Sequence, residues 1–154
     1  MTEKKGSVVK GSYVLLIQLP EEQMIAVGSR QNIYFTNGCY AYVGSTLGGF
    51  KSRINRHLRR NKRPHWHIDY LLQKASITGI VLYKTNGRVE CNIARALSRQ
   101  FDSIPGFGSS DCKCQSHLFF AAEESMMEAK IMENISLPGI KPRLWTDLSS
   151  LLIN

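Results

Sequence analysis

The sequence predicts an α+β fold, a small and mostly antiparallel β-sheet flanked by helices. The chain has 154 residues, of which 43% are apolar and 21% charged, as expected for a globular domain with a hydrophobic core. Short segments rich in β-branched and large apolar residues come first, and segments with helical periodicity follow. The order β-β-β-β-α-α-β-α-β-α is typical of a small antiparallel sheet with helices packed on it.

Four strands are expected in the first third of the chain. Turn-forming residues separate them: Pro20 ends the first strand, and Asn37-Gly38 is a strong turn signal before the fourth. These strands are predicted at Ser12–Leu19, Met24–Val27, Ile33–Thr36 and Tyr40–Val43.

Helices and two further strands are expected in the rest of the chain. Apolar residues at helical spacing predict helices at Gly49–Arg60, His67–Lys74, Glu90–Phe101 and Glu123–Asn134. Apolar runs predict strands at Ile77–Tyr83 and His117–Ala121, and a glycine- and serine-rich loop at Ile104–Asp111. A short final segment is expected around Leu148–Ile153.

A basic helix follows the fourth strand directly. Arg53, His57 and Arg60 are spaced by four and three residues, so they share one face of this helix. An apolar stripe at Phe50 and Ile54 lies beside that face. The arrangement suits a helix that packs on the core while it holds a phosphate near reactive groups.

The charge balance favours polyanionic partners. The formal net charge is +8 and the isoelectric point is about 9.5, so DNA or RNA is expected ahead of simple solubility. We expect no membrane association, because no apolar run approaches the roughly 20 residues that a membrane span needs. The charged N-terminus has no apolar signal core, so we expect a cytoplasmic protein with reduced cysteines.

Several motifs occur in the order found in one nuclease superfamily. Gly11-Ser12-Tyr13 lies on the first strand, Tyr42-Val43-Gly44 at a strand end before a helix, and Arg53 on that helix. Together with Arg56-His57 and the stretches HWHIDY and GFGSSDC, they resemble the GIY-YIG nuclease superfamily. The resemblance is to a divergent, mostly prokaryotic branch of unassigned function, which is sometimes fused to a DNA-repair glycosylase.

The resemblance implies a nuclease-like domain at residues 11–122 and a C-terminal helical extension at 123–154 packed on it. It further implies metal-dependent hydrolysis of phosphodiester bonds in nucleic acid, with DNA expected ahead of RNA. The long gap between the two motifs implies an extra hairpin or loop. Two alternatives stay open: a nucleic-acid-binding module without catalysis, and a zinc-stabilised structural or partner domain.

Two tyrosines are the candidates for activating a water molecule. By the resemblance, one of Tyr13 and Tyr42 acts as the base and the other positions it. Nearby cations are expected to lower a tyrosine pKa. The alternative is that both are ordinary strand residues packed on a sheet face.

Cationic side chains would bind the substrate. Arg53 offers a fixed fork of donors that matches phosphate oxygens, and His57 could orient a tyrosine or donate a proton. The alternative for both is a solvated helix face. Contacts to nucleic acid are expected from Arg56, Arg60, Lys62, Arg63, His65 and His67. Trp66 would stack on a base or, more simply, anchor the core.

Glu90 is the expected metal ligand. It opens a helix in phase with Ala94 and Leu97, and a carboxylate on an apolar stripe is costly unless it is paired or metal-bound. Oxygen ligands suit Mg²⁺ or Mn²⁺. The alternative is a first-turn glutamate that the helix dipole stabilises, and Asp69 and Asp111 are the fallback ligands.

Cys112, Cys114 and His117 are ligands of the types that zinc prefers, but they are only three. Either Cys39 or Cys91 would have to complete the set. The sequence alone therefore favours reduced core thiols over a zinc site.

Overall fold

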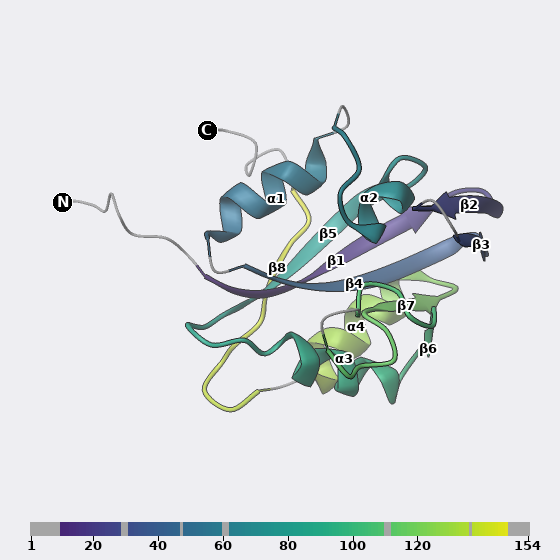
Figure 1. Cartoon of the computed structure of the whole chain (residues 1–154). Coiled ribbons are helices and arrows are strands. Elements are labelled where there is room, and N and C mark those ends of the chain that lie inside the picture. Colours follow the sequence, from purple (N-terminus) through teal and green to yellow (C-terminus); the bar gives the residue numbers. More distant parts are fainter. Residues whose placement is uncertain are drawn as a thin grey trace.

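The computed structural model describes residues 10–28, 31–46, 48–59, 62–109, 112–135 and 137–147. The chain folds into three layers, with one β-sheet between two pairs of helices (Figure 1). The helices are α1 (Phe50–Leu58), α2 (His67–Leu72), α3 (Glu90–Ser98) and α4 (Glu124–Asn134). Figure 1 shows α1 and α2 above the sheet and α3 and α4 below it. No helix in the described ranges is long and apolar enough to span a membrane.

The main sheet has six strands in the order β6-β7-β4-β1-β5-β8, and every neighbouring pair is antiparallel. Its strands are β1 (Gly11–Leu19), β4 (Gly38–Thr46), β5 (Ser76–Lys84), β6 (Asp102–Ser103), β7 (Leu118–Ala121) and β8 (Arg143–Trp145). A separate hairpin consists of β2 (Gln23–Val27) and β3 (Gln31–Phe35). The α+β class and the antiparallel sheet are thus confirmed, and a hairpin fills the gap between β1 and β4.

The structure differs from the sequence-based expectation after residue 123 and at the end of the third helix. The segment after residue 123 is not purely helical, because Arg143–Trp145 pairs with β5 as a sixth strand. The third helix ends at Ser98 rather than Phe101, since the chain turns there and enters the two-residue strand β6. Strands of two or three residues are too short to show periodicity. The segment Leu148–Ile153 lies outside the described residues.

β1 is buried on both faces of the sheet. Tyr13, Leu15 and Ile17 belong to the core under α1 and α2, whereas Val14 and Leu16 belong to the core under α3 and α4. This burial explains why β1 reads as an unbroken apolar run instead of an alternating one. Each buried leucine or isoleucine contributes roughly 1.5–3 kcal/mol of transfer free energy.

The pairing of β1 with β4 brings the tyrosines of the two sequence motifs, Gly11-Ser12-Tyr13 and Tyr42-Val43-Gly44, together on one face of the sheet. Tyr13 is opposite Gly44 and Leu15 is opposite Tyr42, so the two tyrosines lie diagonally across adjacent strands. β7 pairs with β4 only as far as Tyr42, and the last bond on that side runs from the Val43 amide to the His117 carbonyl at 2.9 Å. The far end of β4 therefore borders a cleft instead of a strand.

Asp69 connects α2 to α1 through hydrogen bonds. Its carboxylate is fully buried, accepts two hydrogen bonds of 3.0 Å from Arg56, and accepts two more from the amides of His65 (2.7 Å) and Trp66 (2.9 Å). Burial alone would raise the pKa of Asp69, but these donors outweigh it and hold the pKa below its usual value. With both oxygens engaged, Asp69 is a structural residue and does not serve as a fallback metal ligand.

We expect Asp69→Ala to lower the free energy of unfolding by roughly 2–4 kcal/mol, because it leaves a partly buried guanidinium and two amides without their acceptor. Chemical denaturation at pH 7 measures this loss. Asp102→Ala is the matched control, since Asp102 is exposed in β6 and its loss should change stability by less than about 0.5 kcal/mol. Equal effects of the two substitutions would contradict this role of Asp69.

Candidate active site

A cleft of about 500 Å³ opens beside the far end of β4. Its walls come from β4, α1, the α1–α2 connection, the start of α3 and the loop before β7. The lining residues are Tyr42, Val43, Gly44, Ser45, Gly48, Arg53, His65, Trp66, His67, Arg88, Glu90, Gly108, Cys112 and His117. The cleft thus gathers Tyr42, Arg53 and Glu90, three of the residues predicted from the sequence, from three separate segments.

Tyr13 and His57 form a buried pair behind the cleft. The Tyr13 hydroxyl lies 2.7 Å from Nε2 of His57, and both side chains are almost completely buried. Neither residue lines the cleft itself. His57 also lies edge-on to Tyr42, with 6.2 Å between ring centroids, so it links the buried tyrosine to the one at the cleft wall.

Gly44 makes room for the Tyr13 ring. A Cβ atom at this position would lie 2.5 Å from both Cζ and the hydroxyl oxygen of Tyr13, well inside van der Waals contact. Glycine is therefore required at the end of β4 for the Tyr13–His57 hydrogen bond to form in this geometry.

The expectation that nearby cations lower the tyrosine pKa values is wrong in its net direction. Burial raises the pKa of Tyr42 to about 12, and burial together with the neighbouring Tyr42 raises the pKa of Tyr13 further still. Arg53 acts in the opposite direction on both phenols, but desolvation is the larger effect. Both phenols therefore hold their protons at neutral pH.

His57 is neutral at physiological pH. Burial lowers its pKa to about 3, and the charge of Arg53 acts in the same direction, whereas Asp69 opposes the shift. Its Nδ1 atom is buried and has no hydrogen-bond partner among the described residues. A neutral imidazole can accept a hydrogen bond from a phenol, but with a pKa of about 3 it neither takes up the phenol proton nor stores a proton for donation near neutral pH.

Arg53 is held in a fixed orientation at the cleft. One guanidinium nitrogen donates to the Ser45 carbonyl at 3.0 Å, and the guanidinium carbon lies 4.7 Å from the centre of the Trp66 ring. The guanidinium of Arg56 lies 4.3 Å from the same ring centre. The half-buried ring of Trp66 thus stacks against two arginine side chains through cation–π contacts. This packing agrees with the anchoring role that the sequence suggested for Trp66.

Glu90 is the first residue of α3 and lies at the cleft wall. Its Oε1 atom is buried and finds no hydrogen-bond partner in the part of the chain that the structure describes. The Ser12 hydroxyl accepts a hydrogen bond of 3.3 Å from the Val89 amide, which ties β1 to the start of this helix. An unpartnered buried carboxylate oxygen is costly to keep in a folded protein.

The residues predicted to contact nucleic acid have different surroundings. His65 and His67 line the cleft, and Arg63 is exposed. The Lys62 ammonium donates to the carbonyls of His57 (3.1 Å) and Arg59 (2.6 Å) at the end of α1, while Arg56 is bound to Asp69. Arg60 and Asp111 lie outside the described residues. Arg88 also lines the cleft, although its position in a loop gave no sequence signal.

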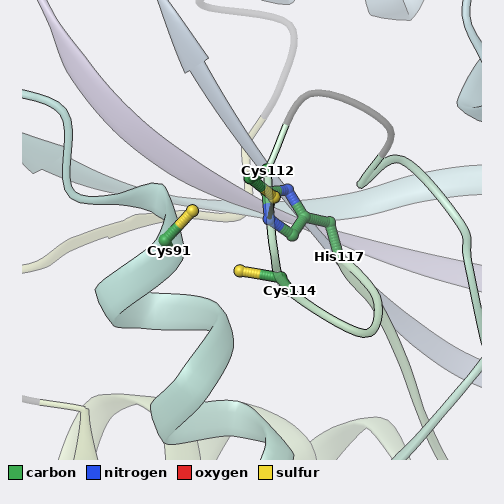
Figure 2. Close-up of side chains that lie close together, drawn as sticks. All are labelled: Cys91, Cys112, Cys114 and His117. Carbon is green, nitrogen blue, oxygen red and sulfur yellow. Dashed lines mark hydrogen bonds between the residues drawn. The ribbon is translucent and has the colours of Figure 1, made fainter.

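Four side chains beside the cleft form a cluster that could hold a metal ion. In this Cys/His cluster, the ligand atoms of Cys91, Cys112, Cys114 and His117 all lie within 4.8 Å of one another. Figure 2 shows Cys91 extending from α3 toward the other three side chains, which come from the loop before β7. Burial raises the pKa of Cys91 to about 12, and the neighbouring thiols act in the same direction.

The cysteines match the expectation of reduced core thiols only in part. All four are free, Cys39 is buried in the core with its sulfur 3.5 Å from that of Met127, and Cys114 packs against the same core. Cys91, Cys112 and Cys114 are half-buried, however, and gather with His117 in the cluster that could hold a metal ion. Cys91 rather than Cys39 supplies the fourth group. Sequence reasoning left this choice open, because Cys91 lies 21 residues before Cys112 and only the packing of α3 brings them together.

The fold and the cleft define an α+β domain with a candidate site for anions and cations. Over residues 12–138 the chain matches the model of a family described as a domain of unknown function, DUF123, and it belongs to that family. No curated protein and no solved structure matches the chain.

We expect His57 to make the protein lose stability in acid. The unfolded chain binds a proton at His57 below about pH 6.5, whereas the native state does so only near pH 3, so stability is complete above pH 6.5 and falls below it. The loss between pH 7 and pH 4 should be roughly 2–3 kcal/mol larger than in His57→Gln, which has no such proton. The free energy of unfolding of both proteins is measured by chemical denaturation at each pH. The same dependence on pH in the two proteins would contradict a buried, neutral imidazole.

Proposed function

We propose that this protein hydrolyses phosphodiester bonds in nucleic acid, with DNA ahead of RNA as the substrate. The observation that carries the proposal is the meeting of Tyr42, Arg53 and Glu90 at one cleft. Hydrolysis of a phosphodiester needs a cationic side chain that binds the phosphate, a carboxylate that can hold a metal ion and a group that contacts the attacking water, and it needs them close together. The ordered motifs that resemble GIY-YIG nucleases and the net charge of +8 support the same proposal.

Arg53 binds the reacting phosphate. Its hydrogen bond to Ser45 and its stacking on Trp66 fix the guanidinium before substrate arrives, so little ordering is needed on binding. The remaining donors of the guanidinium can pair with phosphate oxygens as charge develops on them. His65, His67 and Arg88 on the same walls add positive or polar contacts along the nucleic-acid backbone.

Glu90 holds a divalent cation in this proposal. Its buried Oε1 lacks a partner among the described residues, and a hard carboxylate oxygen suits Mg²⁺ or Mn²⁺. Bound there, the ion would supply charge neutralisation at the phosphate and a lower pKa for a water molecule.

The two tyrosines have different roles in this arrangement. Tyr42 lines the cleft and is the phenol that can meet the attacking water. Tyr13 lies behind it, hydrogen-bonded to the neutral His57, which orients its hydroxyl. This assignment makes Tyr42 the group nearest the water and the Tyr13–His57 pair its buried support.

The proposal predicts that purified protein cleaves plasmid, branched DNA or RNA in Mg²⁺ or Mn²⁺. Arg53→Ala and Glu90→Gln should each lower cleavage by roughly 10²–10³-fold, because each removes a group that acts on the reacting phosphate. Lys51→Ala and Glu133→Gln are the charge-matched controls, since both residues are exposed and outside the cleft. Cleavage that persists unchanged in both cleft variants contradicts the proposal, and salt-dependent binding without turnover supports a non-catalytic binding module instead.

The Cys/His cluster favours a second candidate function, that of a zinc-stabilised structural domain. Thiolate and imidazole ligands select zinc over Mg²⁺ or Mn²⁺. Zinc–sulfur bonds of about 2.3 Å in a tetrahedron place the sulfur atoms about 3.8 Å apart, so ligand atoms already within 4.8 Å need only a small inward movement. Four protein ligands complete a tetrahedron, as in structural zinc sites, and leave no open position for a substrate.

This second function predicts one zinc ion per chain after purification without chelators, measured by elemental analysis. Cys112→Ala should lose the ion, whereas Cys39→Ala should keep it, because Cys39 lies in the core away from the cluster. A chain that carries no zinc and takes none up from solution would contradict it.

A further inference from the structure

We propose that a zinc ion in the Cys/His cluster fixes one wall of the cleft and thereby holds Glu90 in position. The inference deepens the proposed function, on which the part of it that concerns cleavage rests. It makes the cluster a positioning device for the active site instead of a separate stabilising element. Three features of the described residues carry it.

The first feature is the direct covalent link between the cluster and the carboxylate. Glu90 and Cys91 are the first two residues of α3, so a metal bond to Cys91 restrains the backbone that carries Glu90. The start of α3 has no side-chain cap on its first turn, and its Val89 amide makes a long 3.3 Å bond to Ser12. The first turn of a helix frays when few capping hydrogen bonds hold it, and a metal ligand in that turn prevents the fraying.

The second feature is the link between the cluster and the floor of the cleft. The backbone of His117 accepts a hydrogen bond of 2.9 Å from Val43 and donates one of 2.8 Å to the Phe107 carbonyl. Val43 lies between Tyr42 and Gly44 at the end of β4. A metal bound to His117 therefore connects α3 to the strand that carries the cleft tyrosine.

The third feature is the location of the cluster between two hollows. Cys112 and His117 line the cleft, whereas Cys91 and Cys114 line a second hollow of about 530 Å³ that shares no lining residue with the cleft. Figure 2 shows the side chains of the cluster converging in the space between α3 and the loop that precedes β7. A bound metal would hold together the segments that separate the two hollows. The reason is that bonds from the thiols and the imidazole to a shared cation are stronger than the contacts of these groups with one another.

The carboxylate of Glu90 itself needs such support. Its Oε1 has no hydrogen-bond partner in the described part of the chain, so its position depends on where the helix starts. Groups around a metal ligand or catalytic carboxylate commonly change affinity or activity by roughly 10–100-fold when they are removed. An effect of this size is expected when the Cys/His cluster loses its ion.

Hydrogen exchange on the full chain tests the positioning without any substrate. A zinc-selective chelator that leaves magnesium in solution removes the ion, and added zinc restores it. We expect the amides of Ile93 and Ala94, which close the first hydrogen-bonded turn of α3, and the Val43 amide to exchange at least about 10-fold faster in the metal-free chain, with β1 amides such as Leu15 unchanged. Equal exchange at Ile93 and Ala94 with and without zinc overturns the proposal.

Matched variants distinguish the effect of losing a ligand of the Cys/His cluster from the effect of losing any cysteine. Cys91→Ala should reproduce the fast exchange of the metal-free chain, whereas Cys39→Ala should exchange like the wild type with zinc. Where the metal-free chain unfolds as a whole, Cys91→His keeps a zinc ligand but changes the distance from the ion to α3. A Cys91→His chain that retains zinc and cleaves at the full rate overturns the positioning role.

Cleavage assays then distinguish this inference from the proposed function. Zinc removal should lower the rate at saturating DNA by roughly 10-fold or more and change DNA affinity by less than about threefold, because Glu90 acts in the reaction and not in binding. An equal loss of affinity and rate indicates general unfolding and overturns the proposal. If the exchange of Ile93 and Ala94 depends on zinc but zinc-loaded protein never cleaves, the nuclease function fails and the positioning of Glu90 by zinc stands.

Discussion

The antiparallel pairing of β1 with β4 is the constraint on which the cleft depends. It sets Tyr13 opposite Gly44, and the absence of a side chain at Gly44 lets the Tyr13 ring reach His57 on α1. A shift of one residue in this register would turn Tyr13 toward α3 and α4, on the other side of the sheet. Because β1 is buried on both faces, such a shift would also misplace the two cores at once, so the register is strongly fixed.

Burial determines the chemistry of the site more than the net charge does. The cationic helix α1 lies beside the phenols and the imidazole, yet desolvation raises the pKa of Tyr42 and lowers the pKa of His57. All three groups are therefore neutral at physiological pH, while Arg53, Arg88 and Glu90 line the same cleft. The hydrogen-bonded phenol and imidazole orient the side chains of the site and do not carry its charge.

The sequence predicted the elements with strong periodicity. Helix phase pointed to Glu90, whereas Tyr13, Tyr42 and Arg53 were proposed from the resemblance to a nuclease superfamily, and the structure places Tyr42, Arg53 and Glu90 at one cleft. The sequence could not choose between Cys39 and Cys91, since that choice depends on how α3 packs against the loop before β7. Nor could it foresee the pKa of His57, because a helix pattern does not reveal that His57 is buried against Trp66.

The two shortest strands of the sheet have a role of their own. β1, β4 and β5 are nine residues long, and a strand of that length at an open edge is a template for pairing with a second molecule. β8 covers the edge of β5 with three residues and presents the exposed Arg143, while β6 ends the other edge with the exposed Asp102. Short, charged border strands discourage edge-to-edge association, so the C-terminal segment protects the chain from aggregation as well as completing its sheet.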